Sequence, residues 1–491
     1  MASSHGSRNS DEDTNTRQLL KDVNEMILKH HDKATDRTTP VVKFRTPDEL
    51  ASVIDFDVGS DPVNDEAIKR LCEATFEYSV HTDHPRFFNQ QFSGVDKYAL
   101  AGELVVAGVN SNAHTFEVAP VFVMAEKAVI KKALKVFGYE HGEGTFCPGG
   151  TYSSMLATNL ARYHKFPDVK GKGIIGGPRL VMFASNQAHY SVVKNAALMG
   201  IGSDNCIKIA CDNEGRMIVS ELEKEIQKAK NEGAIPIFVV ATAGTTVLGA
   251  FDPFNEIADI CEKHGIWMHV DGCWGGSLML SKKYKHICNG IERSDSLAWN
   301  PHKMISMPIQ CSLLVTKHEG LMSKAHGLDV PYLFQPKKPY DVKYDVSRDL
   351  IQCGRRADAF KLWLAWKARG DEGFEKHVDK AMENAEYFLE LVKKRDNFRL
   401  VTQQPKLTNI SFWFIPPSLR NQKEDDEFWE KMHLVAPTIK TRMQKDGTML
   451  VGYQPLESLV NFFRMIVINN RVTHEDIEFV LDEIERKGAD L

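Results

Sequence analysis

The sequence predicts an α/β fold in which helices cover both faces of a mostly parallel central sheet. Beyond Thr145, short apolar runs alternate with helical stretches, a pattern that is typical of parallel strands joined by crossover helices. At 491 residues the chain is also too long for a single core. The expected strands cover residues 179–183, 235–240, 266–270, 296–299 and 312–315. Ligands of such sheets bind at the carboxyl ends of the strands.

Two residues at this expected edge carry the main chemical signal. Asp271 ends one apolar run, and Lys303 follows shortly after another. An amine can form an imine with an aldehyde, and a carboxylate can keep a pyridine nitrogen protonated so that the ring accepts electrons. This pair suits pyridoxal 5'-phosphate and predicts carbanion chemistry on an amino acid.

A glycine-rich turn over 142–150 leads into a helix that we expect to begin near Ser153. The free N–H groups of a helix amino terminus bind phosphate, and Thr151 and Ser153 add hydroxyl donors. Alone, such a turn is as consistent with a change of chain direction. Together with the lysine and the aspartate, it predicts the phosphate end of the cofactor site.

Two further polar groups follow expected strands at the same edge. His189 comes after the strand at 179–183, and Thr242 comes just after the strand at 235–240. A histidine in this position is often structural, but it can also stack on a cofactor ring or move protons. A small hydroxyl residue allows a flat ring to approach the backbone.

Composition limits the classes of partner. The chain is 43% hydrophobic and 26% charged with a formal net charge of −5, which predicts no binding to nucleic acid or anionic membranes by bulk charge. The amino-terminal residues form no signal-like apolar stretch, so we expect a cytoplasmic protein. The nine cysteines show no paired spacing, which favours reduced thiols and no metal site.

Several motifs, taken in order, resemble those of the group II pyridoxal phosphate decarboxylases. Within that family they are most similar to the acidic amino acid branch, which includes the glutamate, aspartate and cysteine sulfinic acid decarboxylases, the last being the most alike. The stretches lie at residues 84–90, 147–150, 189–191, 241–246, 269–276, 300–303, 332–335, 351–355 and 461–464. The resemblance implies a pyridoxal-phosphate-dependent transferase fold (fold type I, aspartate aminotransferase-like), a homodimer with active sites at the subunit interface, and α-decarboxylation.

The resemblance also implies roles for individual positions. Lys303 would bind the cofactor covalently, Asp271 would pair with the pyridine nitrogen, and His189 would stack over the ring. Tyr332, on a mobile loop, would protonate the product carbanion, with His189 as the alternative. Arg464 would hold the substrate's α-carboxylate. The remaining cofactor contacts would come from Thr151, Ser153, Thr242, Asn300 and His302.

The substrate prediction rests on the segment Gln90–Ser93, in which Gln90, Phe92 and Ser93 are the expected substrate-binding residues. Glutamate decarboxylases carry a small hydroxyl residue where Phe92 stands. A ring there would shorten the pocket and disfavour the longer substrate by about 1–3 kcal/mol. We expect cysteine sulfinate to be converted to hypotaurine, with aspartate to β-alanine as the alternative and glutamate less favoured. Gln91, where relatives usually have an apolar residue, leaves that preference open.

The domain organisation follows from composition and periodicity. We expect a disordered tail at 1–15, a helical, dimer-packing segment at 16–96, a large cofactor-binding α/β domain at 97–371 and a small α+β domain at 372–491.

Two functions of other classes remain open. An aldehyde synthase of the same fold would release ammonia and peroxide, although the loop tyrosine that such enzymes lose is present as Tyr332. A catalytically silent binding protein would stay colourless with pyridoxal phosphate, although Asp271, His189 and Lys303 are all present.

Overall fold

A seven-stranded sheet forms the centre of the molecule in the computed structural model, which describes residues 6–328 and 337–491, with side chains described from residue 16. The strand order is β2-β8-β7-β6-β5-β3-β4. Strands β4, β3, β5, β6 and β7 are mutually parallel, whereas β8 runs antiparallel to both β7 and β2. The predicted α/β class with a mostly parallel sheet is confirmed. The strands are β2 Glu143–Cys147, β3 Leu180–Ser185, β4 Cys206–Ile209, β5 Ile235–Thr242, β6 Trp267–Asp271, β7 Ser296–Trp299 and β8 Ser312–Thr316.

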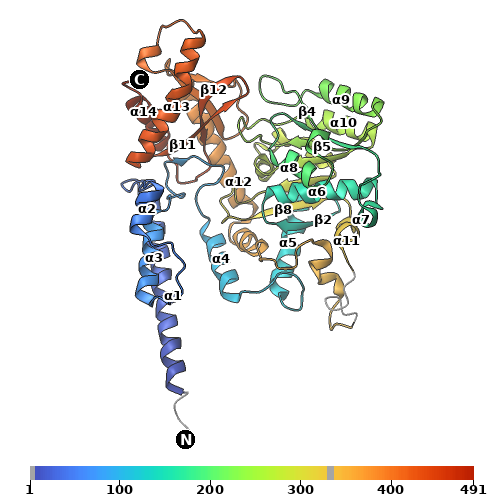
Figure 1. Ribbon diagram of the computed structural model, residues 1–491, viewed down its shortest axis with the longest axis horizontal. Coiled ribbons are helices and arrows are strands. Elements are labelled where there is room, and N and C mark those ends of the chain that lie inside the picture. Colours follow the sequence, from blue (N-terminus) through green and yellow to red (C-terminus); the bar gives the residue numbers. More distant parts are fainter. Residues whose placement is uncertain (1–5, 329–336) are drawn as a thin grey trace.

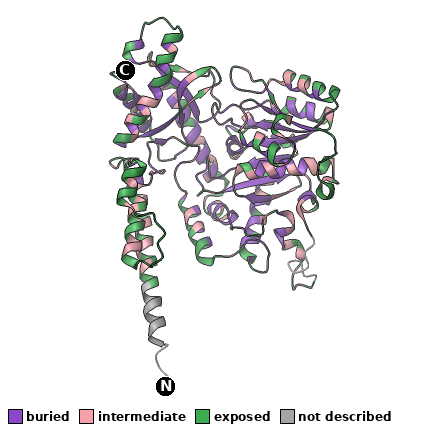
Figure 2. Cartoon of the chain, in the orientation of Figure 1, coloured by how far each residue is buried: buried purple, intermediate pink, exposed green. Residues whose placement is uncertain are grey.

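Both faces of this sheet are buried, which explains the continuous apolar runs. Side chains alternate between the faces of a strand. In β3, Val181 and Phe183 join one apolar core, while Met182 and Ala184 join another. Figure 2 shows the sheet as a buried layer between helices with exposed outer surfaces. The helices of this region are α4 Lys97–Val109, α5 Pro120–Val136, α6 Gly150–Lys165, α7 Val169–Lys172, α8 Ser191–Leu198, α9 Val219–Asn231, α10 Phe254–His264 and α11 Leu321–His326.

A second, five-stranded sheet in the order β1-β11-β12-β10-β9 forms the smaller unit. The long helix α12 connects it to the large sheet and is kinked at Gly370, whose φ of 64° is non-helical. This kink lies beside the boundary that the sequence suggested at 371/372. The elements are β1 Phe87–Phe88, α12 Ala359–Lys393, β9 Phe398–Leu400, β10 Asn409–Phe414, α13 Asp426–Asp446, β11 Leu450–Leu456, β12 Leu459–Ile466 and α14 His474–Lys487.

The amino-terminal helices extend away from both sheets (Figure 1). They are α1 Gly6–Thr35, α2 Pro47–Val53 and α3 Asp65–Tyr78. The helix α1 begins within the stretch 1–15 that the sequence predicted to be disordered, so that prediction is wrong for residues 6–15. Once later turns of a helix are fixed by packing, each added residue gains a backbone hydrogen bond without a new nucleation cost.

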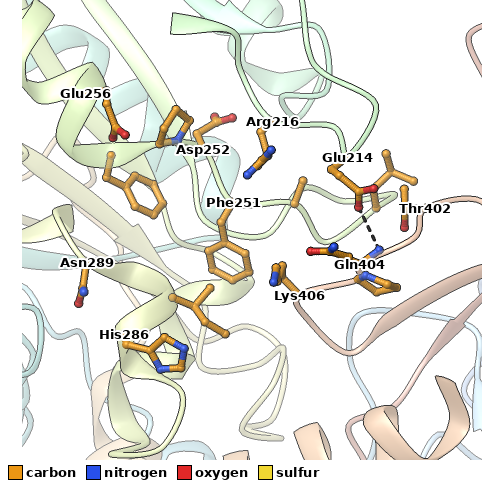
Figure 3. A pocket seen from close by; sticks show the side chains of 16 residues that line it. Glu214, Arg216, Phe251, Asp252, Glu256, His286, Asn289, Thr402, Gln404 and Lys406 are labelled. Atoms are coloured by element: carbon orange, nitrogen blue, oxygen red, sulfur yellow. Dashed lines mark hydrogen bonds between the residues drawn. The ribbon is translucent and has the colours of Figure 1, made fainter. Parts of the chain in front are cut away.

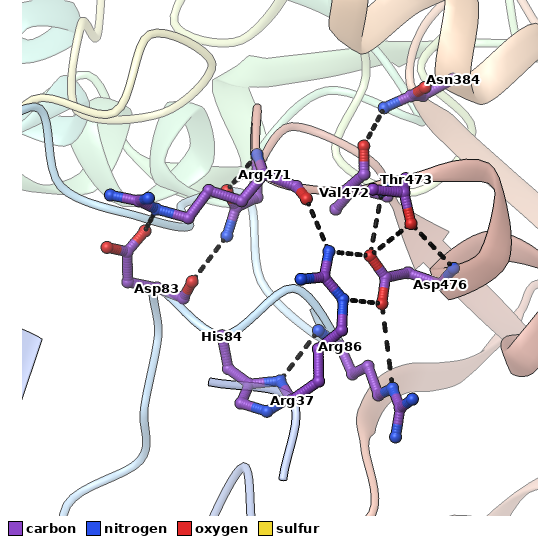
Figure 4. Close-up of polar contacts among 10 residues, drawn as sticks. Arg37, Asp83, His84, Arg86, Asn384, Arg471, Val472, Thr473 and Asp476 are labelled. Atoms are coloured by element: carbon purple, nitrogen blue, oxygen red, sulfur yellow. Dashed lines mark hydrogen bonds and ion pairs between the residues drawn. The ribbon is translucent and has the colours of Figure 1, made fainter. Parts of the chain in front are cut away.

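The amino-terminal segment is fastened to the small sheet unit by charged residues (Figure 4). Arg37 donates to both carboxylate oxygens of Asp476, at 2.8 Å from Nε and 2.6 Å from Nη2. Burial alone would raise the pKa of Asp476, but the Arg37 guanidinium and the Thr473 amide outweigh it and lower the pKa. The guanidinium of Arg86 lies over the Phe479 ring, 3.6 Å from its centroid. In addition, β1 pairs with β11.

Within residues 6–328 and 337–491, we find no helix whose length and hydrophobicity would allow it to cross a membrane.

Candidate active site

Asp271 is the last residue of β6 and is buried at the carboxyl edge of the large sheet. Its Oδ1 accepts a hydrogen bond from the Cys273 amide at 3.1 Å. Burial by itself would raise the pKa of Asp271, but the Lys303 ammonium, the Cys273 thiol and His189 together bring the pKa below its ordinary value. The side chain is therefore an anion at neutral pH, as a partner for a protonated pyridine must be.

Lys303 reaches the same place from the loop after β7. Strands β6 and β7 are adjacent and parallel, so that Asp271 pairs with Ala298 in register. The Lys303 amide donates to the carbonyl of Asn300 at 2.9 Å, which tightens the turn. The Nζ of Lys303 donates to Oε1 of Gln91 at 3.1 Å.

These side chains line a cavity of about 190 Å³. Six of the residues predicted to bind the cofactor reach it, from five segments of the chain. The cavity is lined by Gly150, Thr151, His189, Ser191, Thr242, Gly244, Thr246, Asp271, Cys273, Trp274, Asn300 and Lys303.

The amino terminus of α6 forms one wall of the cavity. No side chain caps this helix, and its N-cap residue Gly149 has a φ of 110°, which favours glycine. A Cβ on Gly150 would lie 2.6 Å from Cys273 Sγ and 2.9 Å from Asn300 Nδ2. Glycine at position 150 thus lets the uncapped amino terminus of α6 approach Cys273 and Asn300 closely at the cavity, a close approach that suits a phosphate-binding turn.

Ser153 and His302 lie just behind this wall and do not line the cavity. The Oγ of Ser153 lies 3.2 Å from the Oγ of Ser312. Nδ1 of His302 lies 2.6 Å from the carbonyl oxygen of Cys311, and burial lowers the pKa of His302 to about 4. In this structure both residues support the wall, and their predicted contact with phosphate stays a prediction.

His189 faces the cavity from the loop after β3. Nδ1 lies 2.7 Å from Ser191 Oγ, and the ring packs against Tyr190 with centroids 4.3 Å apart. Burial lowers the pKa of His189, and the effect exceeds the opposing influence of Asp271. The imidazole is therefore neutral at neutral pH, which suits a group that stacks on an aromatic ring.

Thr242 ends β5 directly beside Asp271, its partner in the strand register. Its Oγ1 is buried and has no hydrogen-bond partner among the described residues. A buried hydroxyl without a partner is costly, so a missing ligand is its simplest explanation. The anion, the amine, the uncapped helix and this hydroxyl fit pyridoxal phosphate.

Arg464 approaches the cavity from the small sheet, on β12. Its Nη1 donates to the carbonyl of Thr246 at 2.9 Å, and its Nε is buried without a partner among the described residues. Burial lowers the pKa of Arg464 to about 10, so the guanidinium remains charged at neutral pH. The placement suits a residue that binds an anionic substrate group.

The predicted substrate-binding residues Gln90, Phe92 and Ser93 do not line the cavity. Gln90 is exposed, the Phe92 ring lies 6.0 Å from the Phe87 ring, and Ser93 Oγ donates to the Thr82 carbonyl at 2.9 Å. The contact of these residues with the substrate, and the argument that Phe92 shortens the pocket, therefore stay predictions. Gln91 faces Lys303 instead, as the hydrogen bond between the two side chains shows. Its departure from the family pattern was the only sequence signal for this role.

The proposed proton donor Tyr332 lies outside the described residues.

A larger cavity of about 360 Å³ lies elsewhere, between the loop that follows β5 and the segment around Gln404 (Figure 3). It contains neither Asp271 nor Lys303. Its buried carboxylate, Asp252, accepts hydrogen bonds from the amides of Met217 and Thr242, each at 2.7 Å. Because the buried carboxylate of this larger cavity already has partners within the protein, we assign the reaction to the smaller cavity, although its volume is lower.

Comparison with known proteins identifies the family to which this chain is similar. Residues 47–415 match the family model for the pyridoxal-dependent decarboxylase conserved domain. An acidic amino acid decarboxylase GADL1 from Xenopus tropicalis is 49% identical over 96% of this chain and 91% of its own length. Human cysteine sulfinic acid decarboxylase is 46% identical over 94% of this chain and 93% of its own. The crystal structure of mouse CSAD in apo form has a TM-score of 0.94 at 44% identity, covering 97% of this chain and 99% of that one.

Proposed function

Because this chain belongs to the pyridoxal-dependent decarboxylase family, we propose that it removes the α-carboxylate of a small acidic amino acid, with cysteine sulfinate as its first substrate and hypotaurine as the product. Aspartate, giving β-alanine, is the alternative, and glutamate is less favoured. The observation that carries the proposal is the convergence of Asp271, Lys303 and Arg464 on one edge of the large sheet.

Pyridoxal phosphate, when bound, supplies a ring that accepts the electron pair released as carbon dioxide leaves. Lys303 would hold it covalently through Nζ. Asp271, an anion in the buried site, would keep a proton on the pyridine nitrogen. Thr151, Asn300 and the uncapped start of α6 would bind the phosphate, with Ser153 and His302 behind them.

Arg464 would orient the substrate. The guanidinium is charged at neutral pH and donates a hydrogen bond to a carbonyl oxygen at the cavity. A carboxylate oxygen of the substrate can accept that hydrogen bond in place of the carbonyl. Fixing the carboxylate selects which bond to the α-carbon breaks.

The proton that replaces the carboxylate must come from a nearby acid. We propose Tyr332, with His189 as the alternative. The neutral His189 ring has one N–H, which would be available at Nε2 when Nδ1 accepts from Ser191 Oγ. Replacing each residue separately distinguishes the two donors.

Substrate preference is supported by relatives of almost equal similarity. A relative named for acidic amino acids is 49% identical, and one named for cysteine sulfinate is 46% identical, each over more than nine-tenths of this chain. Both names describe small acidic amino acids. We keep cysteine sulfinate first and aspartate as a competing or additional substrate.

We also propose that the enzyme works as a homodimer with sites at the subunit interface. Large apolar side chains are exposed on α4 and α5: Leu104 at 44%, Val105 at 45%, Val109 at 58%, Val121 at 62% and Met124 at 46%. Such groups on neighbouring helices mark a surface that another chain covers. Sedimentation at micromolar concentration tests this, and a monomer with full activity would contradict it.

A cytoplasmic location belongs to the same proposal. It is supported by nine cysteines that all carry free thiols, which suits a reducing compartment.

The deciding experiment offers cysteine sulfinate, aspartate, glutamate and cysteate separately at equal concentration to the cofactor-loaded enzyme. We expect amine and carbon dioxide, fastest from cysteine sulfinate. Faster turnover of glutamate would overturn the substrate proposal, and ammonia with peroxide would overturn the reaction itself.

A further inference from the structure

Gln91 is the residue that contacts Lys303 directly. It is buried, its Oε1 accepts from Lys303 Nζ at 3.1 Å, and its Nε2 donates to the Thr246 carbonyl at 3.3 Å. One side chain thus connects the proposed cofactor-binding amine with the loop that follows β5.

The carbonyl of Thr246 receives more donors than it can bond well. Besides Gln91 Nε2, it accepts from Arg464 Nη1 at 2.9 Å and from Asn409 Nδ2 at 3.0 Å. A carbonyl oxygen has two lone pairs. Asn409 is itself fixed, since its Oδ1 accepts from Trp274 Nε1 at 2.6 Å. Gln91 and Arg464 are therefore the donors that can be exchanged.

The exchangeable donors converge on the carbonyl oxygen of Thr246, a residue that lines the cavity. A substrate carboxylate carries a full charge and bonds such donors more strongly than a carbonyl does. A carboxylate that binds Arg464 would come within reach of Gln91 Nε2 as well, because both groups already meet at one point.

We infer that Gln91 is a positioning residue that shares the substrate's α-carboxylate with Arg464 while its Oε1 holds the Lys303 nitrogen. This rests on the proposed function and deepens it. Gln91 touches no distal group of the substrate in this arrangement, so it acts equally on every acidic amino acid and does not select among them.

Two nearly isosteric variants separate the role of Gln91 Oε1, which accepts from Lys303, from the role of Nε2, which donates to the carboxylate. Gln91→Leu removes both hydrogen bonds. Gln91→Glu keeps an acceptor for Lys303 and replaces the donor with a charge that repels carboxylates. Gln227→Leu removes an amide from an exposed position on α9 and is the matched control.

The first readout needs no turnover. The visible band of the cofactor on Lys303 changes with the proton on that nitrogen, and an acceptor beside it favours the protonated form. We expect the pH midpoint to fall by about 1 unit in Gln91→Leu and to rise by a similar amount in Gln91→Glu. Unchanged midpoints in both variants, with the cofactor bound, would overturn the contact with Lys303.

The second readout is turnover. Gln91→Leu should lower kcat/KM about 10-fold to 100-fold for cysteine sulfinate and aspartate alike, and Gln91→Glu should lower it further. Hypotaurine, which has no α-carboxylate, should inhibit the wild type and Gln91→Leu equally. A loss confined to one substrate, or weaker inhibition by hypotaurine, would place Gln91 at the distal group and overturn the inference.

Failure of the proposed function is separately visible. If the wild type releases no carbon dioxide from any acidic amino acid, the proposed function is wrong. The pH midpoints of the cofactor band, which should shift in opposite directions in the two variants, still test the contact between Gln91 and Lys303. Far-ultraviolet circular dichroism and thermal unfolding confirm that each variant is folded.

Discussion

The two cavities described above lie on opposite sides of one loop. They differ in whether their polar groups already have hydrogen-bond partners within the protein. The loop from Ala243 to Phe251 closes on itself as a β-bridge between these residues. Gly244 and Thr246 on this loop line the smaller cavity, whereas Leu248 and Ala250 line the larger one.

In the larger cavity Asp252, Glu214 and Arg216 already have hydrogen-bond partners. Glu214 accepts from the Gln403 and Gln404 amides, and Arg216 donates to Asp212 at 2.8 Å. In the smaller cavity Thr242 Oγ1 and Arg464 Nε have no partner among the described residues. A buried polar atom that the protein leaves unpaired predicts a ligand better than the volume of the space around it does.

The strongest test of this comparison is Lys303→Ala. Without the amine we expect the visible cofactor band to vanish and decarboxylation to fall by at least ~1,000-fold, because covalent attachment is lost. Absorbance and carbon dioxide release measure both. A variant that keeps the band and the activity would move the reaction away from the smaller cavity.

Asp271→Asn should have the next largest effect. An amide cannot keep the pyridine nitrogen protonated, so we expect kcat to fall by ~100-fold or more, with weaker cofactor binding. Steady-state rates at saturating pyridoxal phosphate measure kcat. Near-normal turnover would show that the ring does not need the buried carboxylate.

Asp252, which directly follows the loop between the two cavities, should make the stability of the protein depend on pH. Burial raises its pKa to about 6 from an ordinary value of 3.8, against the opposing amides of Met217 and Thr242. The folded state thus binds this proton more tightly than the unfolded state does. The stability that the group contributes is full below pH ~4 and is lost as the pH rises through about 6.

Asp252→Asn does not titrate and isolates this contribution. The unfolding free energy of the wild type, relative to the variant, should fall by ~3 kcal/mol between pH ~4 and pH ~7. Denaturant unfolding at both pH values measures it. A difference that is independent of pH would contradict a raised pKa.

The smallest effect is expected in the larger cavity. Lys406 is exposed there, and Lys406→Glu reverses its charge. Since the reaction is assigned elsewhere, kcat/KM should stay within about 2-fold of the wild type, the range expected of a surface change. A larger change in kcat/KM would show that the larger cavity influences the reaction in the smaller one.

The sequence was sufficient for five of the seven strands of the large sheet and for the polar residues at their carboxyl ends, but it missed β4 and took the region of β2 for a glycine-rich turn. Continuous apolar runs predicted β3, β5, β6, β7 and β8, and the rule that ligands bind at the carboxyl ends placed Asp271, Thr242 and Lys303 together. These features depend on local pattern and on a general property of parallel sheets.

Contacts between distant segments could not be predicted in this way. Asp252, directly before α10, accepts hydrogen bonds from the amides of Met217 and Thr242, and the N-cap of α10 is Pro253 without a side-chain hydrogen bond. The contact between Gln91 and Lys303 and the packing of the partly buried Phe92 against Phe87 depend on how the segment 87–93 lies across the domain. Sequence spacing contains no information on that path.

One strand pairing has a consequence for how the protein is made. Phe87 and Phe88 form the edge of the small sheet with Leu450 and Val451, near the other end of the chain. During synthesis the first pair leaves the ribosome long before its partner exists, so the edge can close only after translation is nearly complete. Any product that stops short of β11 leaves two phenylalanines without a place to pack, and such an open apolar strand is a site for aggregation.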